Sequence, residues 1–459
     1  MRLSSISLSL LFCSLLSAAP ADLIVSAGRV VTMDAQRHVI VNGAVAIAKG
    51  RILAVGPKAE IDKQYRSAKR IDRPDAILTP GLINTHTHAA MSLLRGIADD
   101  MALQKWLEKF IFPAEGKNVN EQFVRAGTRL AVLEMMLGGT TTYVDMYYFE
   151  DAVAEETKKA GMRGVLGQTI IGFPAPDYKT PELALAGTEK FLERFKNDPL
   201  IVPAVAPHAI YTNSAQTLKA ARALANKYQT LFITHVSETQ KENIDSGGAN
   251  HNMTPTAYLE SLGAMDGRTL FAHEVWTRAN DILALKRHSV GIAHCPSSNM
   301  KLGSGTANIM GMLRTSIPVG LGTDGPAGSN NDFDMFEEMD LASKLAKVSS
   351  QDPTVLPATQ AFAMATIAGA QALGMDKEIG SLEPGKRADL ITVSTDAPNG
   401  WPMHDVYSML VYSLKASDVQ DVVIEGKATV ENRKPLTLNP LAIRREAKML
   451  RDKVDASLK

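Results

Sequence analysis

Short runs of apolar and β-branched residues alternate with longer stretches of helical pattern from Leu78 to about Met375. These runs occupy residues 76–84, 140–146, 163–168, 201–206, 231–234, 269–272, 289–293 and 317–322. A strand followed by a helix, repeated along the chain, is typical of a parallel sheet. Eight such strands close a barrel, and no Gly-rich dinucleotide or phosphate-binding loop follows any of them. We therefore predict an α/β chain with a (β/α)8 TIM-type barrel over residues 78–376.

The two ends of the chain have a different pattern. Short alternating strands with Gly turns occupy residues 22–77 and return after Gly380, for example at 388–393 and 419–430. We expect residues 22–77 and 377–459 to combine into one small β-sandwich domain. A helix from about Pro440 is expected to close the chain.

Charge composition excludes two classes of partner. The chain has 459 residues with 49 basic and 49 acidic side chains, so its formal net charge is zero, and no basic block is longer than a pair such as Arg444-Arg445. Nucleic acid and anionic membranes therefore have no electrostatic footprint here, and we expect a small-molecule partner. A homo-oligomer could form through the apolar helical stripe at 130–137, although this stripe equally suits packing within a barrel.

Residues 1–21 have the pattern of a cleavable signal peptide. Arg2 precedes an apolar stretch at 6–16, and small residues at 19–21 form an A-x-A-like site. The apolar stretch is well short of the ~20 residues that a membrane-spanning helix needs. We expect export to the periplasm or the exterior, with no membrane contact after removal of the leader. Cys295 would then be the one cysteine of the mature chain, which excludes an intramolecular disulfide.

Histidines gather at the carboxyl ends of the predicted strands, where catalytic groups of such barrels lie. Six of the ten histidines fall there, and an aspartate follows the last strand; these residues are His86, His88, His208, His235, His273, His294 and Asp324. His86 and His88 are two apart on an extended strand, so both imidazoles face the same side. Imidazoles with one carboxylate suit Zn²⁺ with an open position for water, and Fe²⁺ or Mn²⁺ would accept the same set.

These motifs resemble the amidohydrolase superfamily. The resemblance covers nearly the whole mature chain and rests on His86-Thr-His88, His235 with Glu238, His273, and Thr323-Asp324-Gly325. Further runs at 91–96, 106–107, 207–208 and 298–303 are most similar to the branch of S-adenosylhomocysteine and methylthioadenosine deaminases, which is related to the chlorohydrolases.

The resemblance implies hydrolytic removal of an exocyclic amine from an adenine nucleoside, with release of ammonia. It implies one divalent metal, because no lysine stands on the fourth strand, with His86, His88, His235 and Asp324 as ligands. Asp324 would accept the proton of water, Glu238 would protonate the ring nitrogen, and His273 would steady the nucleophile. The substrate would be contacted by Glu115, His208, Glu238, His273 and Trp106.

The sequence also allows alternatives for the reaction and for the roles of several residues. A related hydrolase could act on another bond, in a triazine ring, an imide or a dipeptide, and a non-catalytic scaffold is a third reading. No arginine lies between Gln168 and Arg194, where relatives acting on S-adenosylhomocysteine are expected to bind its carboxylate. Glu115 is either a substrate ligand or a surface carboxylate, and Trp106 is either a pocket wall or a packing residue. His294 and Asn299 are interpreted as residues that organise their loops.

Overall fold

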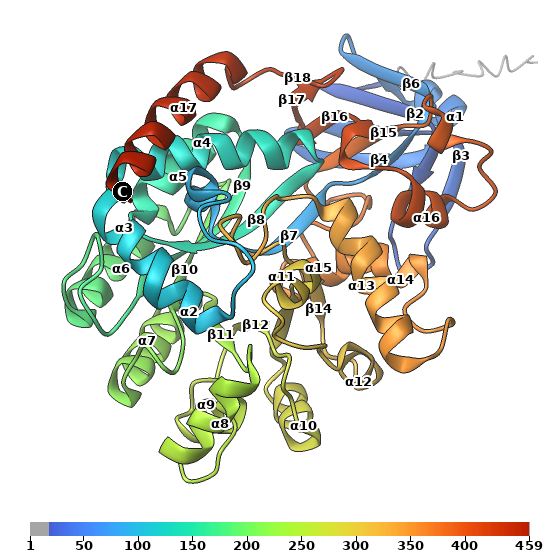
Figure 1. Cartoon of the computed structure of the whole chain (residues 1–459). Coiled ribbons are helices and arrows are strands. Elements are labelled where there is room, and N and C mark those ends of the chain that lie inside the picture. The colour runs from blue at the N-terminus through green and yellow to red at the C-terminus, as the bar shows by residue number, and fades with distance from the viewer. Residues whose placement is uncertain (1–17, 459) are drawn as a thin grey trace, which may run out of the picture.

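The computed structural model of the chain describes residues 18–458 (Figure 1). Most of the predicted signal peptide, residues 1–17, lies outside this range. The central sheet is parallel and has eight strands, each hydrogen-bonded to the next in chain order. These are β7 (Leu82–Thr87), β8 (Thr140–Tyr147), β9 (Arg163–Ile170), β10 (Ile201–Pro207), β11 (Phe232–Val236), β12 (Thr269–His273), β13 (Gly291–His294) and β14 (Val319–Leu321).

The first and last strands of this sheet meet and close the barrel. The Thr85 hydroxyl donates to the Leu321 carbonyl at 2.9 Å, and the Asp324 amide donates to the His86 carbonyl at 2.9 Å. The predicted (β/α)8 barrel is confirmed.

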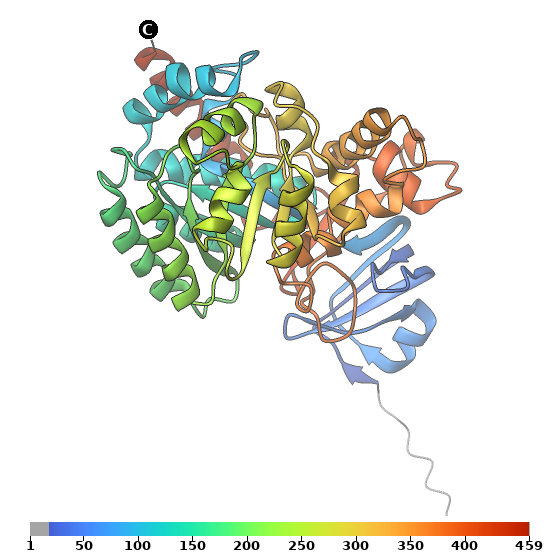
Figure 2. The same ribbon diagram turned by 90° about the horizontal axis from the view of Figure 1, so that it is seen from below.

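Helices follow the strands and surround the barrel (Figures 1 and 2). They are α4 (Glu121–Leu137), α5 (Glu150–Ala160), α6 (Pro181–Phe195), α7 (Ala215–Lys227), α8 (Gln240–Ala249), α9 (Pro255–Ser261), α10 (Ala279–Arg287), α11 (Pro296–Lys301), α12 (Ile309–Arg314), α13 (Met335–Ser350), α14 (Ala358–Met364) and α15 (Ile367–Ala372). Several begin at a side chain that accepts a backbone N–H of the first turn, such as Asn120 before α4 and Asp334 before α13.

The strand predicted over residues 76–84 is wrong as a single element. Its first half ends β6 (Arg70–Pro80) in the terminal sheet, and its second half begins β7. Gly81 makes this crossing feasible, because a Cβ there would lie 2.1 Å from Thr141 Oγ1. At this crossing the Gly81 amide donates a hydrogen bond to the Asp389 carbonyl at 3.0 Å.

Strands from both parts of the chain combine in one small β domain, as predicted (Figure 2), but they form one continuous sheet, and the C-terminal helix packs on the barrel instead of on this domain. Its eight-stranded sheet has the order β18-β17-β16-β15-β6-β2-β3-β4. The strands are β2 (Leu23–Val31), β3 (Val39–Ala48), β4 (Arg51–Pro57), β6, β15 (Leu390–Ser394), β16 (Val419–Ile424), β17 (Lys427–Glu431) and β18 (Lys434–Pro435), with α1 (Lys58–Gln64) beside β3 and β4. Antiparallel pairing of β6 with β15, for example Thr79 with Ile391, joins the two ends. A separate short pair joins β1 (Ala19–Pro20) to β5 (Tyr65–Arg66).

A buried arginine ties the barrel to this domain. Arg163 starts β9 and is 1% exposed, and its guanidinium pairs with Asp389 at 2.8 Å and with Glu425 at 2.6 Å. The predicted last helix is α17 (Pro440–Ser457), which packs on α4 (Figure 1), where Arg129 pairs with Glu446 at 2.7 Å. Within residues 18–458, no helix is both long and apolar enough to cross a membrane.

A helical segment between β7 and α4 supplies one wall of the site described below. It follows the 3-10 helix η1 (Ala89–Leu94) and consists of α2 (Leu103–Trp106), the π-helix η2 (Leu107–Ile111) and α3 (Phe112–Asn118). We call residues 103–118 the entrance helix. Pro113 has no N–H to donate, so the regular α-helical bonding is interrupted at this point, and the chain adopts the wider π geometry just before it.

Candidate active site

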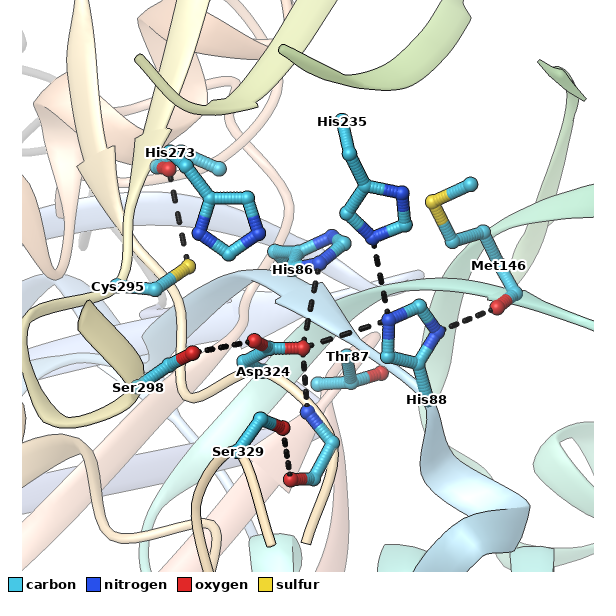
Figure 3. A network of polar contacts seen from close by, with 12 residues as sticks. His86, Thr87, His88, Met146, His235, His273, Cys295, Ser298, Asp324 and Ser329 are labelled. Carbon is cyan, nitrogen blue, oxygen red and sulfur yellow. Dashed lines mark hydrogen bonds and ion pairs between the residues drawn. The ribbon is translucent and has the colours of Figure 1, made fainter. Parts of the chain in front are cut away.

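Four predicted metal ligands converge at the carboxyl end of the barrel (Figure 3). His86 and His88 come from β7, His235 from β11, and Asp324 follows β14. Asp324 Oδ1 lies 3.5 Å from His86 Nε2 and 3.4 Å from His88 Nε2. The Nε2 atoms of His88 and His235 are 3.3 Å apart. Side chains from three separate regions of the sequence therefore point their donor atoms at one small volume.

The hydrogen bonds of these histidines fit a metal site. His88 Nδ1 donates to the Met146 carbonyl at 2.7 Å, and His235 Nδ1 donates to the His208 carbonyl at 2.7 Å. These bonds fix the tautomer that leaves each Nε2 lone pair free. Among residues 18–458, neither ring nitrogen of the fully buried His86 has a hydrogen-bond partner. An orphaned imidazole beside two other imidazoles and a carboxylate fits a divalent ion with nitrogen and oxygen ligands.

Asp324 is held in a strained and strongly polar position. Its φ of +64° is left-handed, which is unusual for a residue other than glycine. Its Oδ2 accepts from the Ser298 hydroxyl at 2.6 Å, and its Oδ1 accepts from the Gly325 amide at 2.6 Å. Burial would raise the pKa of Asp324, but His86 and His88 hold it well below its ordinary value. The carboxyl group is therefore ionised and available as a ligand.

Glu238 and His273 lie beside the ligand set. His273 Nε2 is 3.9 Å from Glu238 Oε2, and His273 Nδ1 donates to Asn299 Oδ1 at 3.1 Å. The interpretation of Asn299 as a loop residue alone is therefore incomplete, since its amide orients His273. Burial, followed by the nearby charge of Asp324, raises the pKa of Glu238 to about 8. At neutral pH this side chain carries a proton that it can donate.

A cavity opens over these groups, and the entrance helix forms one wall with Trp106, Leu107, Ile111, Phe112 and Glu115. Glu115 is 4% exposed, so the alternative of a surface carboxylate is wrong. Its Oε1 accepts from the Tyr147 hydroxyl at 2.6 Å, and burial raises its pKa to about 7. Trp106 lines the cavity and is also a buried packing residue, and its Nε1 donates to the Ala327 carbonyl at 2.8 Å.

The remaining two strand-end histidines differ in their placement. His208 lines the same cavity, with its ring 4.7 Å from the His235 ring, and burial lowers its pKa to about 3, so it is neutral. His294 faces a different cavity beside Ala342. Its Nδ1 has no hydrogen-bond partner in the described part of the chain, so the structure does not bear out the expected hydrogen bonding of His294 to its loop through this atom.

Eight of the nine predicted site residues line one cavity, and the ninth, His86, lies buried against His88 with ring centroids 4.9 Å apart. Tyr147, Ser298 and the Met146 carbonyl also belong to the site and were not predicted from the sequence. Tyr147 ends a barrel strand, so a search for any polar residue at the strand ends would have found it. Ser298 is in α11 and reaches Asp324 only through the fold.

Comparison with known proteins defines the class. The model of the amidohydrolase family matches residues 77–429, well over half of the chain, so the protein belongs to the amidohydrolase family. The same superfamily was predicted from the motifs.

Individual relatives indicate the branch of the family to which the chain is similar. The chain is 44% identical over 411 residues to the 5-methylthioadenosine/S-adenosylhomocysteine deaminase of Thermodesulfovibrio yellowstonii, covering 89% of this chain and 93% of that protein. It is 41% identical over 375 residues to the 5'-deoxyadenosine deaminase of Methanosphaera stadtmanae, covering 81% and 87%. A zinc-bound adenosine deaminase structure from Xanthomonas campestris superposes with a TM-score of 0.94 at 38% identity, covering 96% of this chain and 100% of that one. The predicted branch of the superfamily is confirmed.

Proposed function

We propose that the protein is a metal-dependent hydrolytic deaminase that removes the exocyclic amine of an adenine nucleoside and releases ammonia. The observation that carries this proposal is the convergence of His86, His88, His235 and Asp324 beside a buried, protonated Glu238. The relatives named above are deaminases of adenine nucleosides, which supports this choice over hydrolysis of another bond. The presence of a complete ligand set argues against a non-catalytic scaffold.

The ion that fits the ligand set is proposed to be Zn²⁺, which suits three imidazoles and one carboxylate with an open position. A divalent ion in this site would supply a hydroxide nucleophile at neutral pH by lowering the pKa of water. The zinc reported in the structure from Xanthomonas campestris supports this choice of ion.

The residues of the chain have separate tasks in the proposed reaction. Glu238 donates its proton to the ring nitrogen next to the carbon that bears the amine, so that negative charge does not build up on the ring. Asp324 accepts the proton of the attacking water, and His273, oriented by Asn299, hydrogen-bonds the incoming oxygen. The new C–O bond forms as the ring nitrogen is protonated. The C–N bond then breaks as the amine takes the proton held by Asp324 and leaves as ammonia, while the hydroxyl of the new C–O group gives its proton to Glu238, so that both residues return to their starting state.

The charges around the cavity favour an uncharged nucleoside. The ionisable carboxyl groups that line the cavity are those of Glu115, Glu238 and Asp324. No lysine or arginine among the described residues lines this cavity. Lys179, which could have bound a substrate carboxylate, donates instead to the Ala175 carbonyl at 2.8 Å. We therefore propose adenosine or a 5'-modified neutral adenosine as substrate, with S-adenosylhomocysteine, whose amino-acid end carries a carboxylate, as a poorer one.

A panel of substrates tests this proposal. Zinc-loaded protein is offered adenosine, 5'-deoxyadenosine, methylthioadenosine, S-adenosylhomocysteine, guanine and cytosine, and ammonia is measured. We expect release from the neutral adenine nucleosides, and a lower kcat/KM for S-adenosylhomocysteine. No ammonia from any adenine nucleoside, with zinc bound, would contradict the proposal and favour a hydrolase of another bond.

We also propose that the chain is exported after cleavage of residues 1–21, on the strength of the leader pattern alone. β2, which begins at Leu23, would remain intact in the mature protein.

A further inference from the structure

Asp145 contacts both neighbours of a proposed metal ligand. It lies on β8, beside β7, and is fully buried. Its Oδ1 accepts a hydrogen bond of 2.7 Å from the Thr87 hydroxyl and one of 2.6 Å from the Ala89 amide. Thr87 and Ala89 are the residues immediately before and after His88. One carboxylate oxygen therefore holds the residues on both sides of this histidine, Thr87 through its side chain and Ala89 through its backbone.

The strand pairing alone does not hold His88 in place, because the ladder between β7 and β8 is irregular here. Asn84 pairs with Tyr143 and Thr87 pairs with Asp145, so β7 advances three residues while β8 advances two. A bulge of this kind interrupts the ladder and re-aims the side chains of the bulged strand. The two bonds to Asp145 hold the end of β7 after the bulge, together with a contact of 2.8 Å from the Thr87 hydroxyl to the Val144 carbonyl.

The next residue of β8 completes the arrangement. The Met146 carbonyl accepts from His88 Nδ1 at 2.7 Å and sets the ring (Figure 3), while Asp145 sets the backbone. Two successive residues of one strand thus control the position and the tautomer of a single imidazole.

The burial of this carboxyl group also needs an explanation. In residues 18–458 no lysine or arginine forms an ion pair with Asp145 or with its fully buried neighbour Glu150. Glu150 Oε1 accepts from the Tyr147 amide at 2.8 Å, and burial raises the pKa of Glu150 well above its ordinary value, so this neighbour is neutral. An unpaired buried carboxylate is costly. The bonds from Thr87 and Ala89 offset part of this cost, and a divalent ion held by His88 would offset more of it.

We propose that Asp145 is a positioning residue for His88, and that it acts by fixing Thr87 and Ala89 rather than by touching the substrate or the ion. The proposal rests on the metal site of the proposed function.

Zinc affinity of the purified protein tests this role, measured by competition with a chromogenic chelator. We expect Asp145→Ala to weaken zinc binding by about 10- to 100-fold. Asp145→Asn keeps an oxygen that can accept both bonds, and should recover most of the affinity. The control is Thr142→Val on the same strand, since Thr142 is equally buried and its hydroxyl has no partner in the described part of the chain. This variant should bind zinc as the parent protein does.

A second variant and a spectroscopic signal keep the test decisive if Asp145→Ala does not fold. Thr87→Val removes one of the two bonds to Asp145, and should weaken zinc binding and alter the visible spectrum of the cobalt-substituted protein. Unchanged zinc affinity and an unchanged cobalt spectrum in Asp145→Ala, or in Thr87→Val where the former does not fold, would overturn the proposal. A parent protein that binds no zinc would instead overturn the metal site itself, so the two failures are distinguishable.

Discussion

The Tyr147 hydroxyl donates a hydrogen bond of 2.6 Å to Glu115 Oε1 inside the cavity. The two residues come from different elements, Tyr147 from the end of β8 and Glu115 from the entrance helix. The bond occupies one carboxylate oxygen and holds the other toward the Tyr148 hydroxyl, 3.5 Å away. If Glu115 contacts the substrate, as the resemblance implies, Tyr147 determines where it does so.

Tyr147→Phe should therefore impair substrate binding. A hydrogen bond typically contributes about 0.5–1.5 kcal/mol, and loss of the one that orients Glu115 should raise KM by about 2- to 10-fold. We expect kcat to change little, because Tyr147 is not assigned a proton-transfer role. Steady-state kinetics with adenosine check this, with Tyr148→Phe as the control of smaller effect. A fall in kcat at constant KM would contradict the assignment.

Glu238→Gln should separate metal binding from turnover. The amide has the same shape as the acid but cannot protonate the ring, so we expect a loss of about 10²- to 10⁴-fold in kcat with the zinc content unchanged. His86→Ala and Asp324→Ala should lose the metal. Zinc is measured by elemental analysis of the purified variants. Equal metal loss in all three variants would rule out the separate role of Glu238.

The pH profile should report the same group. Burial raises the pKa of Glu238 to about 8, so its acid form predominates below that pH and is lost above it. We expect kcat/KM to fall about tenfold per pH unit above about pH 8, since the reaction needs the protonated carboxyl group. Glu238→Gln should lack this alkaline limb. Retention of the limb in that variant would assign it to another group.

Much of this fold could be predicted from the sequence, for identifiable reasons. Strand–helix alternation gave the barrel, and parallel strands place their carboxyl ends at one edge, so the gathering of His86, His88, His235 and His273 followed from their positions in the runs. The break at Gly81 was missed because residues 76–84 are mostly apolar and were interpreted as one strand, although the Pro80-Gly81 pair within them is a turn signal.

Other contacts of the site depend on register and on long-range packing. Ser298 reaches Asp324 from α11, and Asn299 reaches His273 from the same helix, through contacts 26 residues apart in the chain. The bulge in β7 that brings Thr87 opposite Asp145 leaves no mark in the sequence either. The assigned catalytic and binding roles remain predictions, whereas the placement of the side chains is structural.

Stability should depend on the buried ion pairs between the two domains. Asp389→Ala would leave the Arg163 guanidinium buried and paired with Glu425 alone. Removing one partner of a buried pair typically costs about 3–5 kcal/mol, and we expect a matching loss in the free energy of unfolding. Urea denaturation measures it, and Asp452→Ala, at an exposed pair with Arg451, is the control. Equal free energies of unfolding in the two variants would show that the ion pairs of Arg163 with Asp389 and Glu425 do not stabilise the protein.

The leader is tested separately. Expression of the full chain should yield a periplasmic or secreted protein that begins at Asp22, which intact-mass measurement would detect. A protein that retains Met1 and stays in the cytoplasm would contradict the export proposal and leave the catalytic account untouched.

Ammonia release from adenosine tests the central claim most directly, compared between zinc-loaded protein, the same protein after chelation, and zinc-loaded Glu238→Gln. We predict stoichiometric ammonia and inosine from the first sample, with recovery of the chelated sample on adding zinc back and little turnover by the variant. Equal ammonia release by all three samples, or none from the zinc-loaded protein with adenosine or any neutral 5'-modified adenosine, would contradict the account.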